Sequence, residues 1–252
     1  DRLAAEGMRF ENHVCSSPVC SPARACLLTG RMPSAHGVHD WIAFRSLPPR
    51  PVQYLRDQPA YTDALAAAGY TVGLSGKWHL GDCRRPQHGY THWLTLPGGS
   101  APYNDPELVR DGRLVPFHGY QTDILFDDAL AFLDAHARDD RPFYLDVHPF
   151  APHAPWHDQP EELTAPYKAC PFRTCPQEWP HPDTRPGLDR WHGVRENLEG
   201  YFAAVTGVDR GVGRLLAKLD KLGLRDSTLV IFLSDNGFSC GQRGLWGKGN
   251  GT

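Results

Sequence analysis

The chain has 252 residues, of which 40% are apolar, 22% charged and 11% aromatic, and this composition supports a packed core and excludes wholesale disorder. Lysine and arginine total 26 against 29 acidic residues, so a net charge of −3 provides no basic field for nucleic acid. No apolar run approaches the roughly 18–20 residues of a membrane span, so we expect no transmembrane segment. The length fits one large α/β domain or two small ones.

Helical and strand patterns alternate along the chain. Residues 1–7 read as the end of a helix that stops at Gly7, and a short helix is expected after Cys20. The other expected helices are 60–68, 123–137 and 195–222, and the expected strands are 70–75, 143–148 and 228–233. Thr122 is the expected N-cap of the second of these helices, and Gly223 ends the third.

This alternation predicts an α/β fold with a mostly parallel central sheet and helices on both faces. Two segments lack periodicity and are rich in turn-forming residues. We expect residues 82–118 and 156–191 to be long surface excursions.

Polar side chains follow all three predicted strands, at the edge where open α/β sheets bind ligands. Lys77 and His79 follow the first strand, His153 the second, and Asp235 with Asn236 the third. Taken singly, each has a plain structural explanation, because histidines near strand ends are usually hydrogen-bonded and Ser-Asp-Asn-Gly often forms a turn. Their convergence on one edge favours a functional site.

The strongest local signal surrounds Cys20. Ser21 suits the N-cap of a helix and Pro22 its first position, and Gly30 suits its end. Cys20 is therefore expected just before a helix N-terminus, where backbone N–H groups favour an anion. Arg24 lies one turn further on and can reach the same point. A capped helix with a buried cysteine explains these residues equally well.

The run Cys20-Ser-Pro-Ala-Arg24, followed by Leu28-Thr-Gly-Arg31, resembles the signature of the type I, formylglycine-dependent sulfatases of the alkaline phosphatase superfamily. Four later segments look like later motifs of that family, in the same order. They are residues 76–81, 152–156, 234–237 and 244–248. The resemblance covers essentially the whole chain, and five ordered motifs are much more specific than one.

The resemblance implies that a maturation enzyme, the formylglycine-generating enzyme, oxidises Cys20 to formylglycine. Cys15 and Cys26 are not implied, since neither begins a Cys-x-Pro-x-Arg run. One hydroxyl of the hydrated aldehyde would attack sulfur and release the alcohol. Loss of a proton from the second hydroxyl would then expel sulfate and restore the aldehyde, without attack by water on a crowded anion.

The family pattern also implies roles for the remaining polar residues. Arg24 would orient the formylglycine, and Lys77 and Lys248 would clamp the sulfate. His79 would act as the base for the second hydroxyl, and His153 would protonate the leaving oxygen.

A divalent cation is implied as well, Ca²⁺ with Mg²⁺ as the alternative. Its ligands here would be Asp235, Asn236 and the modified Cys20. The family's two adjacent aspartates from a first strand have no counterpart, because 127–128 and 139–140 lie in or beside a helix far downstream. Ala23 also departs from the serine that is commonest in the family.

We therefore expect residues 1–252 to be part of the N-terminal catalytic domain, beginning after its first strand and without the smaller C-terminal subdomain. Such a piece is expected to bind the cation poorly and to hydrolyse sulfate esters weakly or not at all. Family habit favours a periplasmic or secreted location.

Several alternatives stay open at this point. The chain could be a phosphonate or phosphodiester hydrolase of the same superfamily, or a truncated relative without catalysis. The substrate could be a sulfated carbohydrate or an aryl sulfate. The aromatic side chains of 156–191 either stack on sugars or form a satellite hydrophobic cluster; the residues concerned are Trp156, His157, Trp179, His181 and Trp191.

The cysteines leave a further question open. Seven cysteines are an odd number, and a chain of this length does not need a disulfide framework. Cys170 and Cys175 could close a small disulfide loop or stay reduced, and no convincing zinc spacing stands out.

Overall fold

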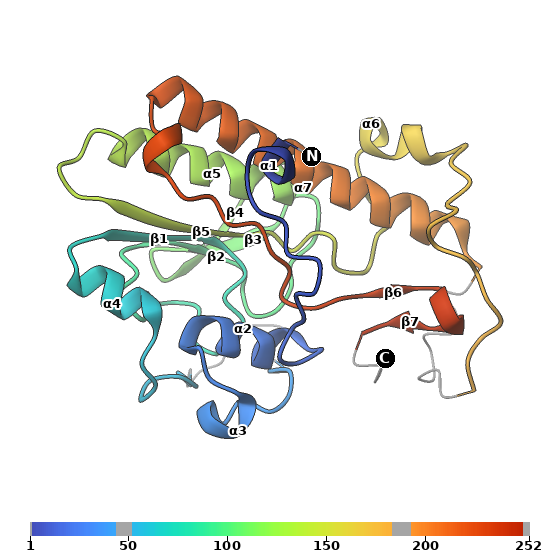
Figure 1. The fold of residues 1–252 in the computed structure, drawn as a ribbon, viewed down its shortest axis with the longest axis horizontal. Coiled ribbons are helices and arrows are strands. Elements are labelled where there is room, and N and C mark those ends of the chain that lie inside the picture. Colours follow the sequence, from blue (N-terminus) through green and yellow to red (C-terminus); the bar gives the residue numbers. More distant parts are fainter. Residues whose placement is uncertain (1, 44–51, 183–192, 249–252) are drawn as a thin grey trace.

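A five-stranded sheet with the strand order β4-β3-β2-β1-β5 lies at the centre of the computed structural model, which describes residues 2–43, 52–182 and 193–248 (Figure 1). The strands are β1 (Thr71–Gly76), β2 (His92–Thr95), β3 (Glu107–Arg110), β4 (Arg113–Pro116) and β5 (Phe143–His148). The strands predicted over 70–75 and 143–148 are therefore confirmed.

β1 is parallel to both of its neighbours, with Gly76 opposite Thr95 of β2 and His148 of β5. It is buried along almost its whole length, as expected for a parallel strand covered on both faces. β3 and β4 join the other edge in antiparallel fashion. The prediction that 82–118 is a surface excursion was wrong, because strands of four residues are too short to leave a periodic signal.

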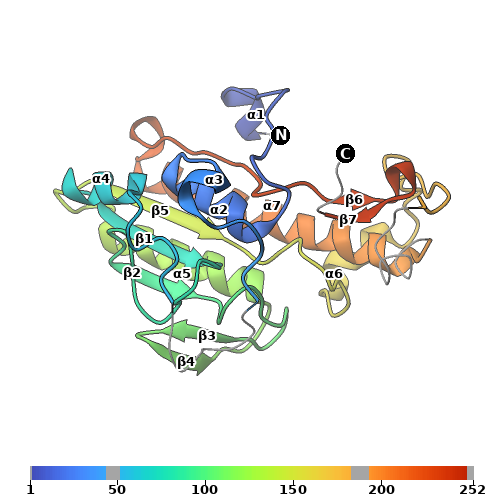
Figure 2. The ribbon, with the colours of Figure 1, turned by 90° about the horizontal axis from the view of Figure 1, so that it is seen from below.

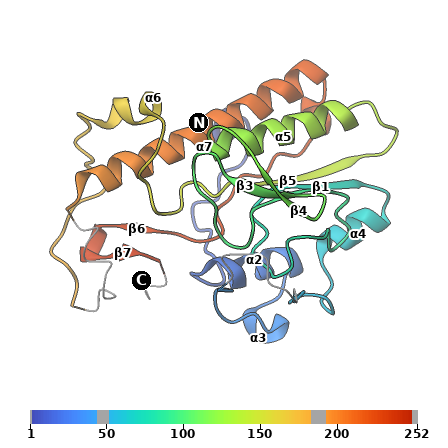
Figure 3. The ribbon, with the colours of Figure 1, turned by 180° about the vertical axis from the view of Figure 1, so that it is seen from behind.

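Helices cover both faces of the sheet (Figures 1 and 3). α5 (Gln121–His136) and α7 (Arg195–Leu222) lie on one face, and α2 (Cys20–Thr29), α3 (Pro33–His36) and α4 (Tyr61–Ala67) on the other. The remaining elements are α1 (Arg2–Glu6), α6 (Glu161–Thr164), the 3₁₀ turns η1 (Ala165–Tyr167), η3 (Arg225–Ser227) and η4 (Gln242–Gly244), and a hairpin of β6 (Ser239–Cys240) and β7 (Trp246–Gly247). The predicted α/β class, with helices on both faces, is confirmed.

None of the helices in the described ranges is long and apolar enough to cross a membrane. The predicted ends of two helices are confirmed, since Gly30 and Gly223 both adopt the left-handed conformation that closes a helix. Two predicted N-caps were wrong. Thr122 lies inside the first turn of α5, and Ser21 lies inside α2, where its Oγ accepts a 3.0 Å hydrogen bond from the Ile42 backbone N–H.

The predicted strand over 228–233 is not formed. Figure 2 shows these residues as an extended trace between α7 and β6. Leu229 is 84% exposed, Ile231 70% and Phe232 67%. A β-strand needs a partner for its backbone groups, and no strand within the described ranges pairs with this segment. The apolar pattern is that of a strand, but the neighbour that would complete it is missing here.

The buried apolar residues form three groups, and part of the excursion 156–191 belongs to the smallest of them, which we call the third cluster. It consists of Trp156, Phe172, Cys175, Leu198, Cys240 and Trp246. Trp156 is therefore a member of a satellite hydrophobic cluster, one of the two roles expected for it. Trp179 is 92% exposed, and His157 and His181 are also exposed, whereas Trp191 falls outside the described residues.

The contact between α5 and α7 depends on a glycine. A Cβ atom at Gly211 would lie 2.1 Å from the ring of the buried Phe126, whereas one at Gly213 would meet nothing within 4 Å. We expect Gly211→Ala to lower the free energy of unfolding by about 1–3 kcal/mol, because the packed ring cannot move aside freely. Gly213→Ala in the same helix should raise it by up to about 1 kcal/mol. Urea denaturation of both variants measures this difference, and equal effects would contradict the packing argument.

Candidate active site

Cys20 is the centre of the site. It is the first residue of α2 and is only 4% exposed. Lys248, which follows β7, donates a 2.5 Å hydrogen bond from Nζ to the Cys20 sulfur. The helix start adds unpaired backbone N–H groups and a partial positive charge beside the same atom.

The surroundings of Cys20 favour a negative charge. Burial opposes ionisation of the thiol, but hydrogen bonding with His153 and His79 and the charges of Lys77 and Lys248 outweigh it. Together they lower the pKa of Cys20 to about 3. The pocket is therefore built to hold an anion at the position of this sulfur.

Arg24 connects three parts of the chain. Its guanidinium donates a 2.8 Å hydrogen bond to the backbone carbonyl of Lys77 and forms a 3.1 Å ion pair with Asp235 Oδ2. Burial opposes ionisation of Asp235, but Arg24 and the two lysines hold the pKa of this carboxyl below its usual range. Arg24 thus joins α2 to the end of β1 and to the segment before β6.

The end of β1 places Lys77 in the site. Gly76 has φ +125° and lies so close to β5 that a Cβ atom would be 2.1 Å from the His148 carbonyl oxygen. This close approach lets the Lys77 backbone N–H donate a 2.7 Å hydrogen bond to that oxygen. Burial, with Arg24 as the next cause, lowers the pKa of Lys77 to about 8, and its Nζ lies 5.9 Å from the centre of the Phe150 ring.

The His79 ring is held in one orientation through its Nε2 atom. Its Nε2 lies 2.9 Å from the Ile42 carbonyl oxygen, which can only accept a hydrogen bond, so Nε2 carries the proton. Nδ1 is buried and has no partner of normal geometry in the described ranges, although the ring is close enough to Cys20 to affect its pKa. Burial lowers the pKa of His79, which favours the neutral ring, and in that form Nδ1 carries the lone pair.

His153 follows β5 and is oriented in a similar way. Its Nδ1 donates a 2.6 Å hydrogen bond to the Ala154 carbonyl, so Nε2 is the nitrogen left for chemistry. The ring stacks on Phe150 with centroids 4.9 Å apart. The backbone carbonyl of His153 accepts a 2.8 Å hydrogen bond from the Tyr103 hydroxyl.

The third cluster supports two sides of the site at once. Trp156 comes three residues after His153, and Trp246 comes two residues before Lys248. Their rings pack 6.0 Å apart inside the cluster. The histidine and the lysine are thereby held relative to each other although they are far apart in sequence.

Asp235 and Asn236 offer the oxygen atoms that a hard cation prefers. The Asn236 Oδ1 atom is buried and has no hydrogen-bond partner in the described part of the chain, while Nδ2 donates to the Gly237 carbonyl at 2.9 Å. An orphaned amide oxygen beside a carboxylate fits a cation in donor type. Residues 2–43, 52–182 and 193–248 contain no group of three or more His, Cys, Asp or Glu arranged to hold a metal, so the donors fall short in number.

Seven of the eight predicted site residues are linked to one another by these contacts: Cys20, Arg24, Lys77, His79, His153, Asp235 and Lys248. Asn236 is adjacent in sequence but does not contact Cys20 in any described interaction. The supporting groups Ile42, Tyr103 and Phe150 were not predicted from the sequence. Phe150 could have been predicted from its position between β5 and His153, whereas Ile42 and Tyr103 come from distant loops and carry no local signal.

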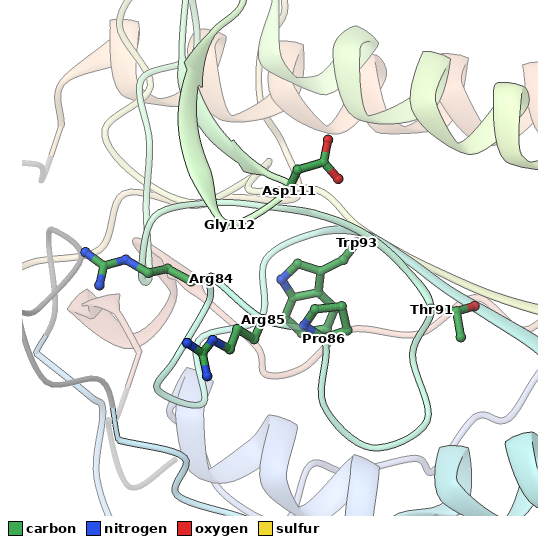
Figure 4. Close-up of a pocket in the computed structure, with 7 residues that line it drawn as sticks. All are labelled: Arg84, Arg85, Pro86, Thr91, Trp93, Asp111 and Gly112. Carbon is green, nitrogen blue, oxygen red and sulfur yellow. The ribbon is translucent and has the colours of Figure 1, made fainter.

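A cavity of about 350 Å³ lies away from these residues. It is lined by Arg84, Arg85, Pro86, Thr91, Trp93, Asp111 and Gly112 (Figure 4). The guanidinium groups of Arg84 and Arg85 point away from the Asp111 carboxylate, so the polar groups do not converge on one point. The chemistry of the chain is concentrated around Cys20 instead.

Comparison with known proteins identifies the family. A family model described as Sulfatase matches residues 1–252. An N-acetylglucosamine-6-O-sulfatase of Bacteroides thetaiotaomicron is 28% identical, with 98% of this chain and 55% of the relative covered. An ulvan-active sulfatase of Formosa agariphila is 32% identical, with 94% and 45% covered.

A solved structure gives the same result for the fold. A protein in complex with its substrate D-glucosamine-2-N,6-O-disulfate superposes with a TM-score of 0.78 at 26% identity, with 98% of this chain and 61% of that chain covered. The chain spans about half the length of the curated relatives that it matches. Because the Sulfatase family model matches residues 1–252, this chain belongs to the sulfatase family.

Proposed function

We propose that this chain carries most of the catalytic groups of a sulfuric ester hydrolase that acts through a formylglycine at position 20 and a divalent cation. The observation that carries the proposal is the convergence of Lys77 and Lys248 on one buried cysteine, with Arg24 bonded to the Lys77 backbone carbonyl beside them. Positive charge around one anion-holding position is complementary to the negative charge of a sulfate group. A non-catalytic binding module would have no need of two oriented imidazoles beside them.

A formylglycine hydrate at position 20 would supply one hydroxyl that attacks sulfur and a second whose deprotonation releases sulfate. The side chains of this chain would bind the sulfate and keep the reacting groups in position. Lys248 Nζ already contacts the Cys20 side chain, and Lys77 lies beside it, so both ammonium groups can stabilise sulfate oxygens as charge shifts during transfer. Arg24 would keep Asp235 and the end of β1 in place through its two contacts.

The two imidazoles suit opposite proton transfers. His79 is neutral, with Nε2–H bound to the Ile42 carbonyl, so Nδ1 is free to take a proton from a hydroxyl at position 20. His153 keeps its Nδ1 proton on the Ala154 carbonyl, so the proton delivered to the leaving alcohol oxygen would come from Nε2 of the doubly protonated imidazolium, which then returns to the neutral ring. Each ring has one nitrogen tied to a carbonyl and the other available to the reaction.

A Ca²⁺ or Mg²⁺ ion would be held by Asp235, Asn236 and the modified residue 20. Bound there, it would supply Lewis acidity toward the nucleophile and the sulfate oxygens. The unpartnered Oδ1 of Asn236 supports this assignment. Two protein oxygen donors are few for a calcium site, so we propose that carboxylates from outside residues 1–252 complete it, as the family's adjacent aspartates would.

A sulfated saccharide is the substrate class that we propose. The support comes from relatives described as acting on N-acetylglucosamine-6-O-sulfate and ulvan, and from the solved structure with a sulfated glucosamine bound. Sulfate and phosphate esters have similar geometry, so a phosphodiesterase is the nearest competing activity. Parallel assays of an aryl sulfate and an aryl phosphodiester, on the full-length matured protein, separate the two.

Mass spectrometry of the peptide that contains Cys20 tests the proposed nucleophile. From the native host, or after coexpression with a formylglycine-generating enzyme, we expect a loss of about 18 Da relative to cysteine, the mass difference between a CH₂SH and a CHO side chain. An intact thiol from the native host would favour the non-catalytic relative.

In the matured full-length protein, Lys248→Ala should lower kcat for an aryl sulfate by about 10²–10³-fold.

Calcium titration tests the incompleteness of the metal site. Residues 1–252 should bind Ca²⁺ more weakly than about 10⁻⁴ M in calorimetry, because few oxygen donors face it and cations surround them. Asp235→Asn should abolish whatever binding is seen. Tight, stoichiometric binding by these 252 residues would contradict the proposal of missing ligands.

Ultraviolet absorbance tests the electrostatics of position 20 without any activity. In the chain produced without the maturation enzyme, the lowered pKa predicts that Cys20 is a thiolate at pH 6. The difference in absorbance at about 240 nm between this chain and Cys20→Ala should then be constant from roughly pH 5 to pH 8. A difference that grows with a midpoint near the ordinary thiol pKa of about 8.5 would overturn the assignment.

A further inference from the structure

Two cysteines outside the candidate active site lie together in the third cluster. Cys175 is 8% exposed and comes from the segment that follows η1, whereas Cys240 is 2% exposed and lies in β6. Both belong to the same group of buried residues as Trp156 and Trp246. The chemistry proposed around Cys20 makes no use of either thiol.

Two glutamine side chains report how closely the two backbones approach. Gln177 Nε2 donates hydrogen bonds to the carbonyl oxygens of both Cys175 and Cys240, each at 2.9 Å. Gln242 Oε1 accepts from the Cys240 backbone N–H at 2.8 Å, while its Nε2 lies 3.7 Å from the Cys175 sulfur. Each glutamine amide therefore reaches both Cys175 and Cys240. This proximity is consistent with the Cα separation of about 4.4–6.8 Å that a disulfide requires.

The two thiols also influence each other directly. Burial, with Cys175 as the next cause, raises the pKa of the Cys240 thiol to about 12, and a hydrogen bond between the two side chains contributes. Burial likewise raises the pKa of Tyr201 to about 12, with small contributions from both cysteines. These shifts agree with the hydrogen bonds in placing the two sulfurs side by side.

The structure gives Cys170 a different setting. Its backbone carbonyl accepts a 2.8 Å hydrogen bond from Arg195 at the start of α7. Within the described ranges, no interaction joins the side chain of Cys170 to that of Cys175. The geometry therefore favours a link from Cys175 to β6 over the small loop between Cys170 and Cys175 that the sequence left open.

We propose that Cys175 and Cys240 form a disulfide bond when the chain folds in an oxidising compartment. The oxidant is a disulfide donor: each thiol gives up a proton and one electron, the new sulfur–sulfur bond forms, and the donor disulfide is reduced to two thiols. A buried thiol with a raised pKa exchanges slowly, so the bond forms during folding, before the cluster closes.

The proposed bond has a consequence for the site. Cys240 is opposite Trp246 in the β6–β7 pairing, and Lys248 follows two residues later. Cys175 belongs to the segment that continues from Trp156, the tryptophan that packs against Trp246. The bond would fasten the hairpin that carries Lys248 to the segment that follows His153.

Non-reducing peptide mapping tests the linkage. The full chain is refolded with oxidised glutathione as the probe, trapped with iodoacetamide and digested. We expect one linked pair of peptides, containing Cys175 and Cys240, about 2 Da lighter than their summed thiol forms because two hydrogens are lost. Alkylation of both thiols, or a link between Cys170 and Cys175, would overturn the proposal.

Thermal unfolding tests the same bond through stability. The oxidised chain should lose about 5–10 °C in Tm when a reductant is added. Cys240→Ser and Cys175→Ser should show no reductant-dependent shift, whereas Cys170→Ser should keep it. Each variant is compared with itself with and without reductant, so a general loss of stability from the substitution does not mimic the result. A reductant-dependent shift that survives in Cys240→Ser would also overturn the proposal.

Discussion

The structure around α2 depends on the neutralisation of buried positive charge. Arg24, Lys77 and Lys248 converge on one small volume, and like charges in a region of low dielectric repel strongly. The pKa of Lys77 is lowered mainly by burial, and repulsion from Arg24 and Lys248 adds to the effect. Two anions offset this repulsion, the Asp235 carboxylate and the group at position 20. The site is therefore preorganised for a negative ligand, and the fold has to hold the cations in place without one.

The fold meets this constraint by fixing each cation from a different element. Arg24 lies in α2 and donates to the Lys77 carbonyl, and Lys77 is held by the close approach of β1 and β5 at Gly76. Lys248 is carried by the β6–β7 hairpin, whose position depends on the packing of Trp246 against Trp156. Because the three anchors are independent, none of the cations can relax away from the others without breaking a packed contact elsewhere.

The sequence predicts the parts of the fold that have continuous patterns. β1 is buried and α7 is amphipathic over enough residues to be recognised, and β5 has an apolar pattern over six residues. Motif residues follow β1 and β5. It fails where the deciding contact is distant. Ser21 resembles a cap but bonds to Ile42, and Thr228–Leu233 has a strand pattern but no described partner. The Ile42 carbonyl orients the His79 imidazole, and the Tyr103 hydroxyl donates to the backbone carbonyl of His153, but nothing in the local sequence marks either residue.

The same charge balance would couple the binding of the proposed cation to the binding of the proposed sulfate group. One oxygen of Asp235 is already paired with Arg24, so a divalent ion placed beside it meets a carboxylate that is partly neutralised. Lys77 and Lys248 add further repulsion toward that ion. A sulfate group brings negative charge to the same volume, which lowers the cost of holding the cation, and the cation in turn strengthens the hold on sulfate. Asp235 and Asn236 alone do not outweigh three positive side chains, so the metal ion that we propose for this site would depend on anions that the substrate or further carboxylates supply.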